Sequence, residues 1–147
     1  MDELTIRPVQ LHELAAARQL ILEGLAEQWG FLDETRNPDL DDIPGYYAAG
    51  EFLVAQHAGR VVGTGALLPE GTDTGRIVRM SVDRAYRRQG IGRAILQSLT
   101  AEARRRGYCR LVLETTATWD AAIAFYRAQG YRPVGEQLGD LHFIKHI

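Results

Sequence analysis

The stretch that decides the fold of this chain is Arg79-Met80-Ser81-Val82-Asp83-Arg84-Ala85-Tyr86-Arg87-Arg88-Gln89-Gly90-Ile91-Gly92-Arg93-Ala94-Ile95-Leu96. Met80 and Val82 alternate with the polar Ser81, which is typical of the end of a β-strand. From Ile91 onward, apolar residues recur at three- and four-residue steps, which predicts an amphipathic helix to about Arg106. The stretch therefore predicts a strand, a polar turn and a helix in that order.

Two glycines, Gly90 and Gly92, stand in the first turn of this predicted helix. Each costs about 1 kcal/mol of helix stability relative to alanine, so their presence needs a physical reason. The first N–H groups of a helix lack intrahelical partners and form an anion site, which bare glycines let a bulky anion approach. Arg87, Arg88 and Arg93 add charge that suits phosphate oxygens. The pattern predicts a phosphate or pyrophosphate site, and the alternative is an exposed turn with solvated arginines.

The loop has neither the Gly-Lys-Ser/Thr ending of a P-loop nor the three-glycine dinucleotide fingerprint. Its Arg-x-x-Gly-x-Gly pattern, Arg87 to Gly92, follows Met80-Ser81-Val82 and resembles the pyrophosphate loop of the GCN5-related N-acetyltransferase (GNAT) family, which binds acetyl-coenzyme A. A second segment, Leu113-Glu114-Thr115 followed by Ala121 to Tyr131, resembles the C-terminal signature of that family. With the order of predicted elements, the resemblance covers essentially the whole chain.

The composition is that of a globular protein with one core, because 46% of the 147 residues are hydrophobic and 24% are charged. We expect a single domain over residues 1–147. The net charge of −2 gives no support for nucleic-acid binding, for which the arginines at 84–93 and 104–106 are the only argument. One cysteine excludes an internal disulfide, and neither a signal peptide nor a membrane span is visible, so we expect a cytoplasmic location.

The predicted fold class is α/β with a mixed sheet (α+β), in which a central mixed β-sheet is flanked by helices on both faces. The resemblance implies the GNAT acyl-CoA N-acyltransferase fold. The expected helices are 11–28, a short one near 40–49, 91–106 and 120–129. The expected strands are 4–7, 52–56, 61–68, 76–82, 109–115, 131–134 and 141–147, of which 109–115 is expected to be buried on both faces.

The resemblance also implies roles for single residues. The implied cofactor-binding residues are Met80, Ser81, Val82, Arg87, Arg88, Gln89, Gly90, Ile91, Gly92 and Arg93. The first three would offer backbone groups to the pantetheine arm, and the others would hold the pyrophosphate. The sheet would splay between strands 76–82 and 109–115, with the acyl group in the gap. Tyr126 would lie near the coenzyme sulfur and donate to the departing thiolate, and the alternative is an aromatic packed on the helix face.

The general base is where the sequence departs from many relatives, which carry a glutamate on the central strand. Residues 74–78 contain no carboxylate. Glu114 is the best substitute, directly or through water, and Glu70 is a weaker one. The alternative for Glu114 is a structural carboxylate paired with an arginine. Cys109 is expected to be a buried small hydrophobe and not a nucleophile.

Acceptor selection in this family usually comes from the first two helices, their connection and the last strands. The candidate acceptor-binding residues here are Trp29, Phe31, Tyr46, Tyr47, Trp119 and His142. Trp119 stands where relatives often have an asparagine, and it either packs at the site or has a plain packing role. Asp33 and Glu34 lie in an acidic loop that would attract a cationic amine or merely be solvated.

The resulting hypothesis is an acetyl-CoA-dependent N-acetyltransferase that transfers acetyl directly to a primary amine of a small molecule or peptide. Acetyl-CoA is the co-substrate, and the spacing of the four histidines predicts no metal. We expect no nucleic-acid or membrane partner, and a monomer or homodimer. The alternative is a non-catalytic acyl-CoA-binding regulatory module.

Overall fold

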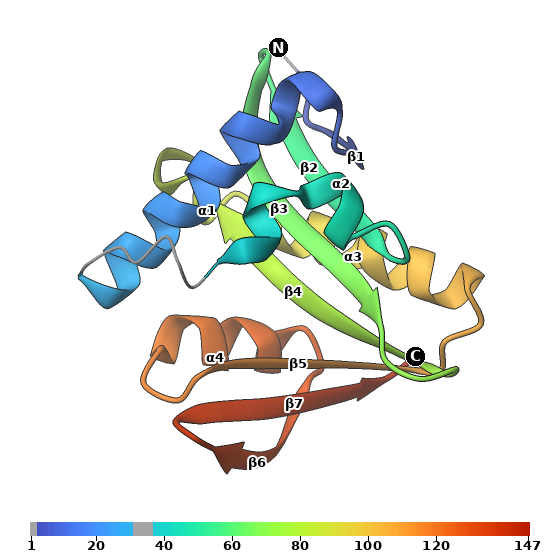
Figure 1. Cartoon of the computed structure of the whole chain (residues 1–147). Coiled ribbons are helices and arrows are strands. Elements are labelled where there is room, and N and C mark those ends of the chain that lie inside the picture. The colour runs from blue at the N-terminus through green and yellow to red at the C-terminus, as the bar shows by residue number, and fades with distance from the viewer. Residues whose placement is uncertain (1–2, 31–36) are drawn as a thin grey trace.

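The computed structural model of the chain describes residues 3–30 and 37–147. The described strands form one seven-stranded sheet in the order β1-β2-β3-β4-β5-β7-β6 (Figure 1). The strands are β1 (Thr5–Pro8), β2 (Glu51–His57), β3 (Arg60–Pro69), β4 (Thr74–Val82), β5 (Arg110–Thr116), β6 (Arg132–Gln137) and β7 (Asp140–His146). Only β4 and β5 pair in parallel among these strands, which confirms the predicted mixed sheet.

The helices are α1 (Leu14–Trp29), α2 (Ile43–Tyr46), α3 (Ile91–Arg105) and α4 (Asp120–Ala128), with 3-10 turns η1 (Leu11–Glu13), η3 (Pro38–Asp41) and η4 (Arg84–Tyr86). The short helix expected near 40–49 is instead split between η3 and α2. Pro38 and Pro44 stand in the first turns of these two elements, where a missing N–H costs little.

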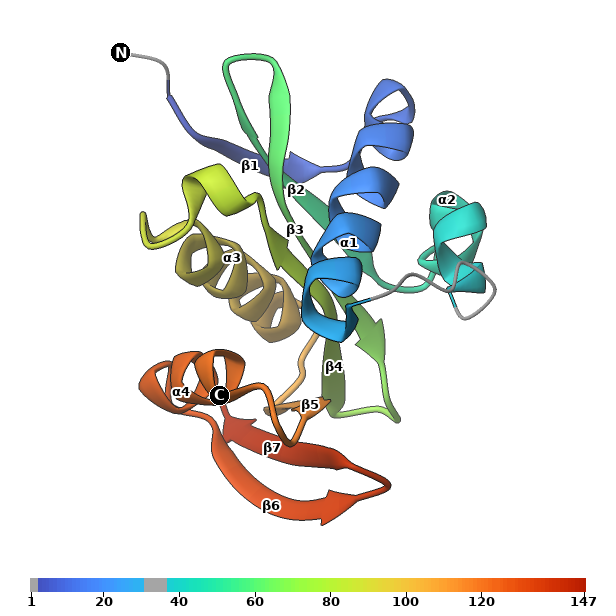
Figure 2. The ribbon, with the colours of Figure 1, turned by 90° about the vertical axis from the view of Figure 1, so that its left-hand side faces the viewer.

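Helices cover both faces of the sheet, as the sequence predicts (Figure 2). On one face, α1 packs with Val54 and Ala66 in a core cluster that also includes Leu40 and Ile43. On the other face, α3 and α4 pack against alternate residues of the same strands, including Ala55 and Leu67. The two faces therefore follow from the period-2 alternation of apolar residues along β2 and β3.

The prediction that β5 is buried on both faces is wrong. Leu111 and Leu113 are buried, but Val112 is half-buried and Glu114 is exposed. The reason is that α3 and α4 cover one side of this half of the sheet, whereas α1 and α2 pack over β2, β3 and β4. The face that carries Glu114 is therefore accessible to solvent.

Close packing of α3 on the sheet depends on Gly65 of β3. A Cβ atom at this position would lie 2.5 Å from Ile95 Cγ2 and 2.7 Å from Met80 Sδ. No rotamer change of residue 65 itself relieves such overlaps, so a side chain here would push α3 or Met80 away. Gly65 thus leaves room for Ile95 of α3 and Met80 of β4 to pack closely on β3.

The sheet opens between β4 and β5, as predicted from the resemblance. Register pairs join only Thr74 to Arg110, Gly75 to Leu111 and Arg76 to Val112. Beyond these pairs the two strands diverge. The sheet therefore separates into two halves, one made of β1 to β4 and the other of β5, β7 and β6 (Figure 1). The far end of β4 therefore presents an edge inside the molecule.

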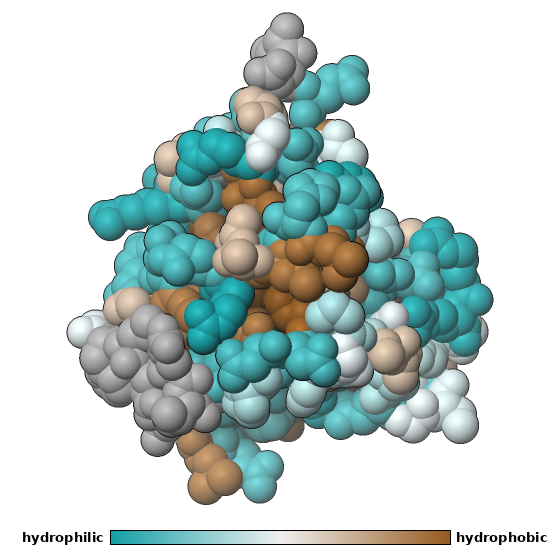
Figure 3. Space-filling view, turned by 45° about the horizontal axis from the view of Figure 1, so that its top comes forward, coloured by the Kyte–Doolittle hydropathy of each residue, from teal (hydrophilic) through white to brown (hydrophobic). Residues whose placement is uncertain are grey.

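On the face shown in Figure 3 polar side chains predominate, and the largest group of apolar side chains lies near the centre of that face. An apolar groove of about 210 Å³ lies between η1, α1, α2 and β2 and is lined by residues that include Leu14, Ile43 and Phe52. Among the described residues, no helix is long and apolar enough to cross a membrane.

Candidate active site

The glycine-rich loop leads from the open edge of β4 into α3. Asp83 caps the short turn η4 by accepting a hydrogen bond from the Ala85 N–H at 2.9 Å. Gly90 is the residue before α3 and has φ +82°, a conformation that suits glycine. The first intrahelical bond runs from the Ala94 N–H to the Gly90 carbonyl at 3.0 Å. The N–H groups of residues 91–93 therefore precede the helical ladder, and N–H groups in this position are able to bind an anion.

The three arginines of this loop differ in their partners. Arg87 donates to both carboxylate oxygens of Glu27 of α1, at 2.7 and 2.9 Å, and its Nε donates to the Val82 carbonyl at 3.4 Å. The hydrogen bond from Arg87 lowers the pKa of the Glu27 carboxyl. Arg88 and Arg93 are exposed and have no ion-pair partner in the part of the chain that the structure describes. Arg88 and Arg93 therefore have no ion pair to break before they bind a phosphate, whereas Arg87 is paired with a carboxylate.

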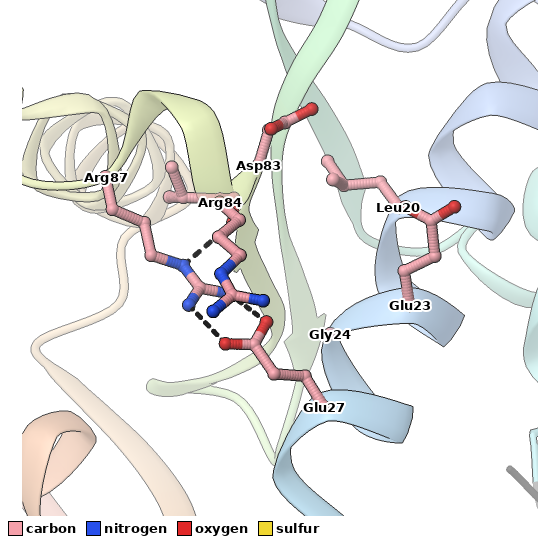
Figure 4. A pocket seen from close by; sticks show the side chains of 8 residues that line it. Leu20, Glu23, Gly24, Glu27, Asp83, Arg84 and Arg87 are labelled. Carbon is pink, nitrogen blue, oxygen red and sulfur yellow. Dashed lines mark hydrogen bonds and ion pairs between the residues drawn. The ribbon is translucent and has the colours of Figure 1, made fainter. Parts of the chain in front are cut away.

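A cleft of about 340 Å³ lies where α1 meets the end of β4 and this loop (Figure 4). Its lining residues are Leu20, Glu23, Gly24, Glu27, Val82, Asp83, Arg84 and Arg87. Arg84 and Arg87 both extend toward Glu27 from the loop side of this cleft (Figure 4). The cleft thus joins the predicted phosphate loop to the C-terminal half of α1.

The backbone of β4 directs polar groups into the opening beside β5. The Asp83 N–H donates to the Val62 carbonyl of the β3 side at 2.8 Å. Because successive residues of a strand direct their N–H groups to opposite sides, the Val82 N–H is directed toward the opening. This geometry agrees with the expected role of residues 80–82 as a strand edge available for pairing.

Tyr126 lies on the buried face of α4. Its ring centroid is 5.1 Å from that of Phe125, 5.9 Å from Tyr131 and 6.1 Å from Phe143. Burial raises the pKa of its phenol above the ordinary value. The ring is therefore packed among other aromatic rings, and the raised pKa favours the protonated phenol, which can donate a hydrogen bond. A role at the coenzyme sulfur remains a prediction.

Glu114 is paired with an arginine, which is the alternative that the sequence analysis left open. Arg76 of β4 donates to Glu114 across the strand pair and also to both oxygens of Glu70, at 2.7 and 2.9 Å. Glu114 stands directly opposite His142 in the β5–β7 register, and His142 Nδ1 lies 3.9 Å from Glu114 Oε2. The cluster holds two carboxylates against one guanidinium, so its formal charge is negative when His142 is neutral.

Four of the six predicted acceptor residues form two aromatic pairs. Trp29, at the end of α1, meets Trp119, just before α4, with ring centroids 5.3 Å apart in an edge-on arrangement. Tyr46 is exposed beside Tyr47, whereas Tyr47 is buried and its hydroxyl donates to Asp39 at 2.6 Å. Tyr47 is therefore largely buried, and its remaining surface contributes to the lining of the apolar groove between η1, α1, α2 and β2. Phe31, Asp33 and Glu34 lie outside the described residues.

The prediction that Cys109 is a buried hydrophobe is wrong, because this residue is exposed. It lies in the turn between α3 and β5, where its N–H donates to the Asp73 carbonyl at 2.8 Å and its carbonyl accepts from Ile147 at 2.9 Å. These backbone hydrogen bonds hold Cys109 at the surface, and its side chain stays outside the core. It also precedes the end of β5 that pairs with β4, away from the opening.

Sequence reasoning missed a buried ion pair beside the opening. Arg79 of β4 donates to Asp39 of η3 through Nε at 2.9 Å and through Nη2 at 2.6 Å. Burial opposes ionisation of Asp39, but the hydrogen bonds from Arg79 and Tyr47 outweigh it and lower the pKa of this carboxyl. No local sequence pattern predicts a contact between residues 40 positions apart. The one indication in the sequence is Arg79 itself, a charged residue within a strand that is otherwise mainly apolar.

The described residues offer no group of three or more His, Cys, Asp or Glu side chains arranged to hold a metal ion.

Solved structures of known proteins have this fold. An acetyltransferase of the GNAT family from Staphylococcus aureus aligns with a TM-score of 0.90 at 20% identity, over 98% of this chain and 99% of that one. The PaiA N-acetyltransferase from Thermoplasma acidophilum, solved in complex with coenzyme A, aligns with a TM-score of 0.86 at 14% identity, over 99% of each chain. The class that these alignments define is the GNAT acyltransferase fold.

Sequence comparison reaches the family itself. The pattern of the acetyltransferase (GNAT) family matches residues 15–131, and the chain belongs to this family. A probable N-acetyltransferase family 8 member 5 from Mus musculus is 36% identical over 137 residues, which cover 87% of this chain and 60% of the relative. The human N-acetyltransferase 8 is 30% identical over 135 residues, which cover 80% of this chain and 60% of the relative. The matches thus span about 60% of the length of these relatives.

Proposed function

We propose that this chain is an acetyl-CoA-dependent N-acetyltransferase that moves an acetyl group directly to a primary amine of a small molecule or peptide. The observation that carries the proposal is the position of the α3 N-terminus. Its N–H groups lie at the end of the loop 83–90, which leads from the edge of β4 that has parted from β5. An anion site joined to an open strand edge suits a ligand with a pyrophosphate and an amide-containing arm.

The residues present fit coenzyme A. The space beside Gly90 is open, since a Cβ atom built there meets no atom within 4 Å. The N–H groups of residues 91–93 and the side chains of Arg88 and Arg93 would hold the pyrophosphate. The edge of β4 at residues 80–82 would pair with the amides of the pantetheine arm as an added strand does. When bound, acetyl-CoA supplies the activated acyl thioester.

The chain would contribute donors to the transfer. The Val82 N–H would donate to the carbonyl oxygen that gains negative charge, as an oxyanion hole does. Tyr126 would donate a hydrogen bond to the departing sulfur. Because burial raises the pKa of Tyr126, while a free thiol has a pKa of about 8.5, a hydrogen bond is favoured over full proton transfer. The acceptor amine must lose a proton, since alkyl amines have a pKa of about 10. Glu114 would take it only through water or after release from Arg76.

The experiment is release of free thiol from acetyl-CoA against a panel of small amines and peptides, with coenzyme binding measured on the same sample by calorimetry. The expected result is binding and amine-dependent thiol release. Gly90→Glu is the matched negative control, because it places charge and strain at the phosphate site. Release that persists unchanged in this variant would refute the assignment of the loop.

A second candidate function is a non-catalytic acyl-CoA-binding regulatory module. The observation in its favour is that Glu114, the predicted base, is held by Arg76 together with Glu70. Coenzyme binding without thiol release for any amine in the panel would favour this alternative. Binding with release excludes it.

A further inference from the structure

The central strand β4 contains a bulge directly before the residues that face the opening. In the β3–β4 ladder, Thr64 pairs with Ser81 and Ala66 pairs with Val78, so Arg79 and Met80 lie opposite the single residue Gly65. Arg79 has φ +56°, in the left-handed region. A residue with a side chain rarely adopts this conformation unless its surroundings compensate for the strain.

The bulge decides which groups face β5. Without the extra residue, Thr64 would pair with Met80, and every later residue of β4 would turn to the other side. The Ser81 N–H would then take the direction that the Val82 N–H has here. The conformation of Arg79 therefore sets the orientation of the strand edge that our proposed function assigns to coenzyme binding.

Three contacts hold Arg79 in this conformation. Its guanidinium forms two parallel hydrogen bonds with Asp39, whose side chain is 9% exposed. Asp39 is itself fixed by the Tyr47 hydroxyl at 2.6 Å. The Arg79 carbonyl accepts a hydrogen bond from Thr64 Oγ1 at 2.7 Å, where β3 faces the bulge. The side chain of Arg79 is thus held by η3, and its main chain is held by β3.

We propose that Asp39 and Arg79 are a positioning pair: their ion pair holds the β4 bulge and so directs the Met80 and Val82 amides into the opening. Neither residue is assigned contact with coenzyme or acceptor. The inference rests on the proposed function, because the opening matters only if coenzyme binds there. It also ties η3, on the α1 side of the sheet, to the strand edge on which acyl transfer would occur.

The test compares three variants with a matched control. Asp39→Asn removes the charge that holds the guanidinium, and Arg79→Gln removes the guanidinium while keeping a side chain on the strained residue. Arg79→Gly also removes the ion pair, but glycine adopts a positive φ without strain. The control is Glu13→Gln, because Glu13 is 4% exposed and receives two hydrogen bonds from Arg7, at 2.6 and 3.0 Å, at a distant place in the chain.

The first readout is coenzyme A affinity by calorimetry, together with melting temperature. We expect Asp39→Asn and Arg79→Gln to bind about tenfold more weakly, which is the size of effect that one strained residue produces. Arg79→Gly should recover most of this affinity although it lacks the ion pair. Glu13→Gln should melt at a lower temperature and bind as the wild type does. Wild-type affinity in all variants, or equal losses in Arg79→Gly and Arg79→Gln, would overturn the proposal.

The second readout needs no ligand. Backbone chemical shifts and the amide-to-α-proton coupling of residue 79 report its φ in the free protein. We expect a shift toward extended φ in Asp39→Asn and Arg79→Gln, but not in Arg79→Gly or Glu13→Gln. An unchanged φ in Asp39→Asn would overturn the positioning role whatever the protein binds. Absence of coenzyme binding by the wild type would instead refute the proposed function.

Discussion

Replacing Gly90 by glutamate tests whether the start of α3 binds phosphate. Gly90 has φ +82°, and no atom lies within 4 Å of a Cβ atom built there. The main cost of a substitution at Gly90 is therefore backbone strain, which is about 1–2 kcal/mol for a residue with a side chain in the left-handed conformation. Gly90→Gln carries the same strain and nearly the same shape, so the difference between the two variants isolates the charge.

The magnitude follows from Coulomb's law. Two unit charges about 6 Å apart interact by about 1.4 kcal/mol at an effective dielectric constant of about 40. A carboxylate facing a pyrophosphate with two charges would thus raise the binding free energy by about 2.8 kcal/mol, a loss of about 100-fold in affinity at low salt. Salt at about 0.5 M should reduce this loss, because it screens exposed charges.

The assay is titration calorimetry of coenzyme A with both variants at low and high salt. We expect Gly90→Gln to bind modestly more weakly than the wild type and Gly90→Glu about 100-fold more weakly than Gly90→Gln. The melting temperatures of the two variants should agree, because they share the same strain. Equal dissociation constants for glutamine and glutamate at low salt would refute the reasoning.

Four further predictions concern single side chains. Tyr131→Phe should leave the free energy of unfolding in urea unchanged or raise it by about 1 kcal/mol, because the buried hydroxyl has no hydrogen-bond partner in the described chain; a clear loss would show that it has one. Glu27→Gln should tighten coenzyme A binding several-fold in calorimetry, since it frees Arg87 from a carboxylate; weaker binding would mean that Glu27 orients Arg87 for the ligand. Tyr126→Phe should lower turnover in the thiol-release assay more than coenzyme affinity, and unchanged turnover would remove its role as a donor. Because the pKa of Asp39 is lowered in the folded state, the folded protein binds fewer protons than the unfolded protein near pH 4. The free energy of unfolding should therefore fall as the pH drops below about 4. Asp39→Asn should reduce this pH dependence, and equal pH dependence of the variant and the wild type would contradict the pairing.

The strand, loop and helix around Gly90 could be predicted because each leaves a local pattern. Alternation marks the end of β4, a three- and four-residue repeat marks α3, and glycines mark the turn between them. The error at β5 has a physical reason: an apolar run such as Leu111-Val112-Leu113 does not show whether a helix covers one face or both. The short elements η3 and α2 each carry a proline in their first turn, and these prolines predict an interruption of the helix expected there but not its form.

The candidate site also has one part that the sequence could predict and another that it could not. The loop residues 87–93 could be proposed as a phosphate site from the sequence because they are contiguous. The pairing of Arg79 with Asp39, and of Arg76 with Glu114, depends on long-range packing that no local pattern encodes. The left-handed conformation of Arg79 was equally hidden, because arginine is not a residue that marks such a position. Contacts that position a site are therefore the part that needs the structure.

The most direct test of the central claim is to map the coenzyme site by NMR, following the backbone amides of the ¹⁵N-labelled chain during titration with acetyl-CoA. The account predicts that the largest shift changes occur at residues 80–82 and 87–93, with little change along β1 and β2. Saturable binding whose shift changes avoid both of these segments would contradict it, as would the absence of any change.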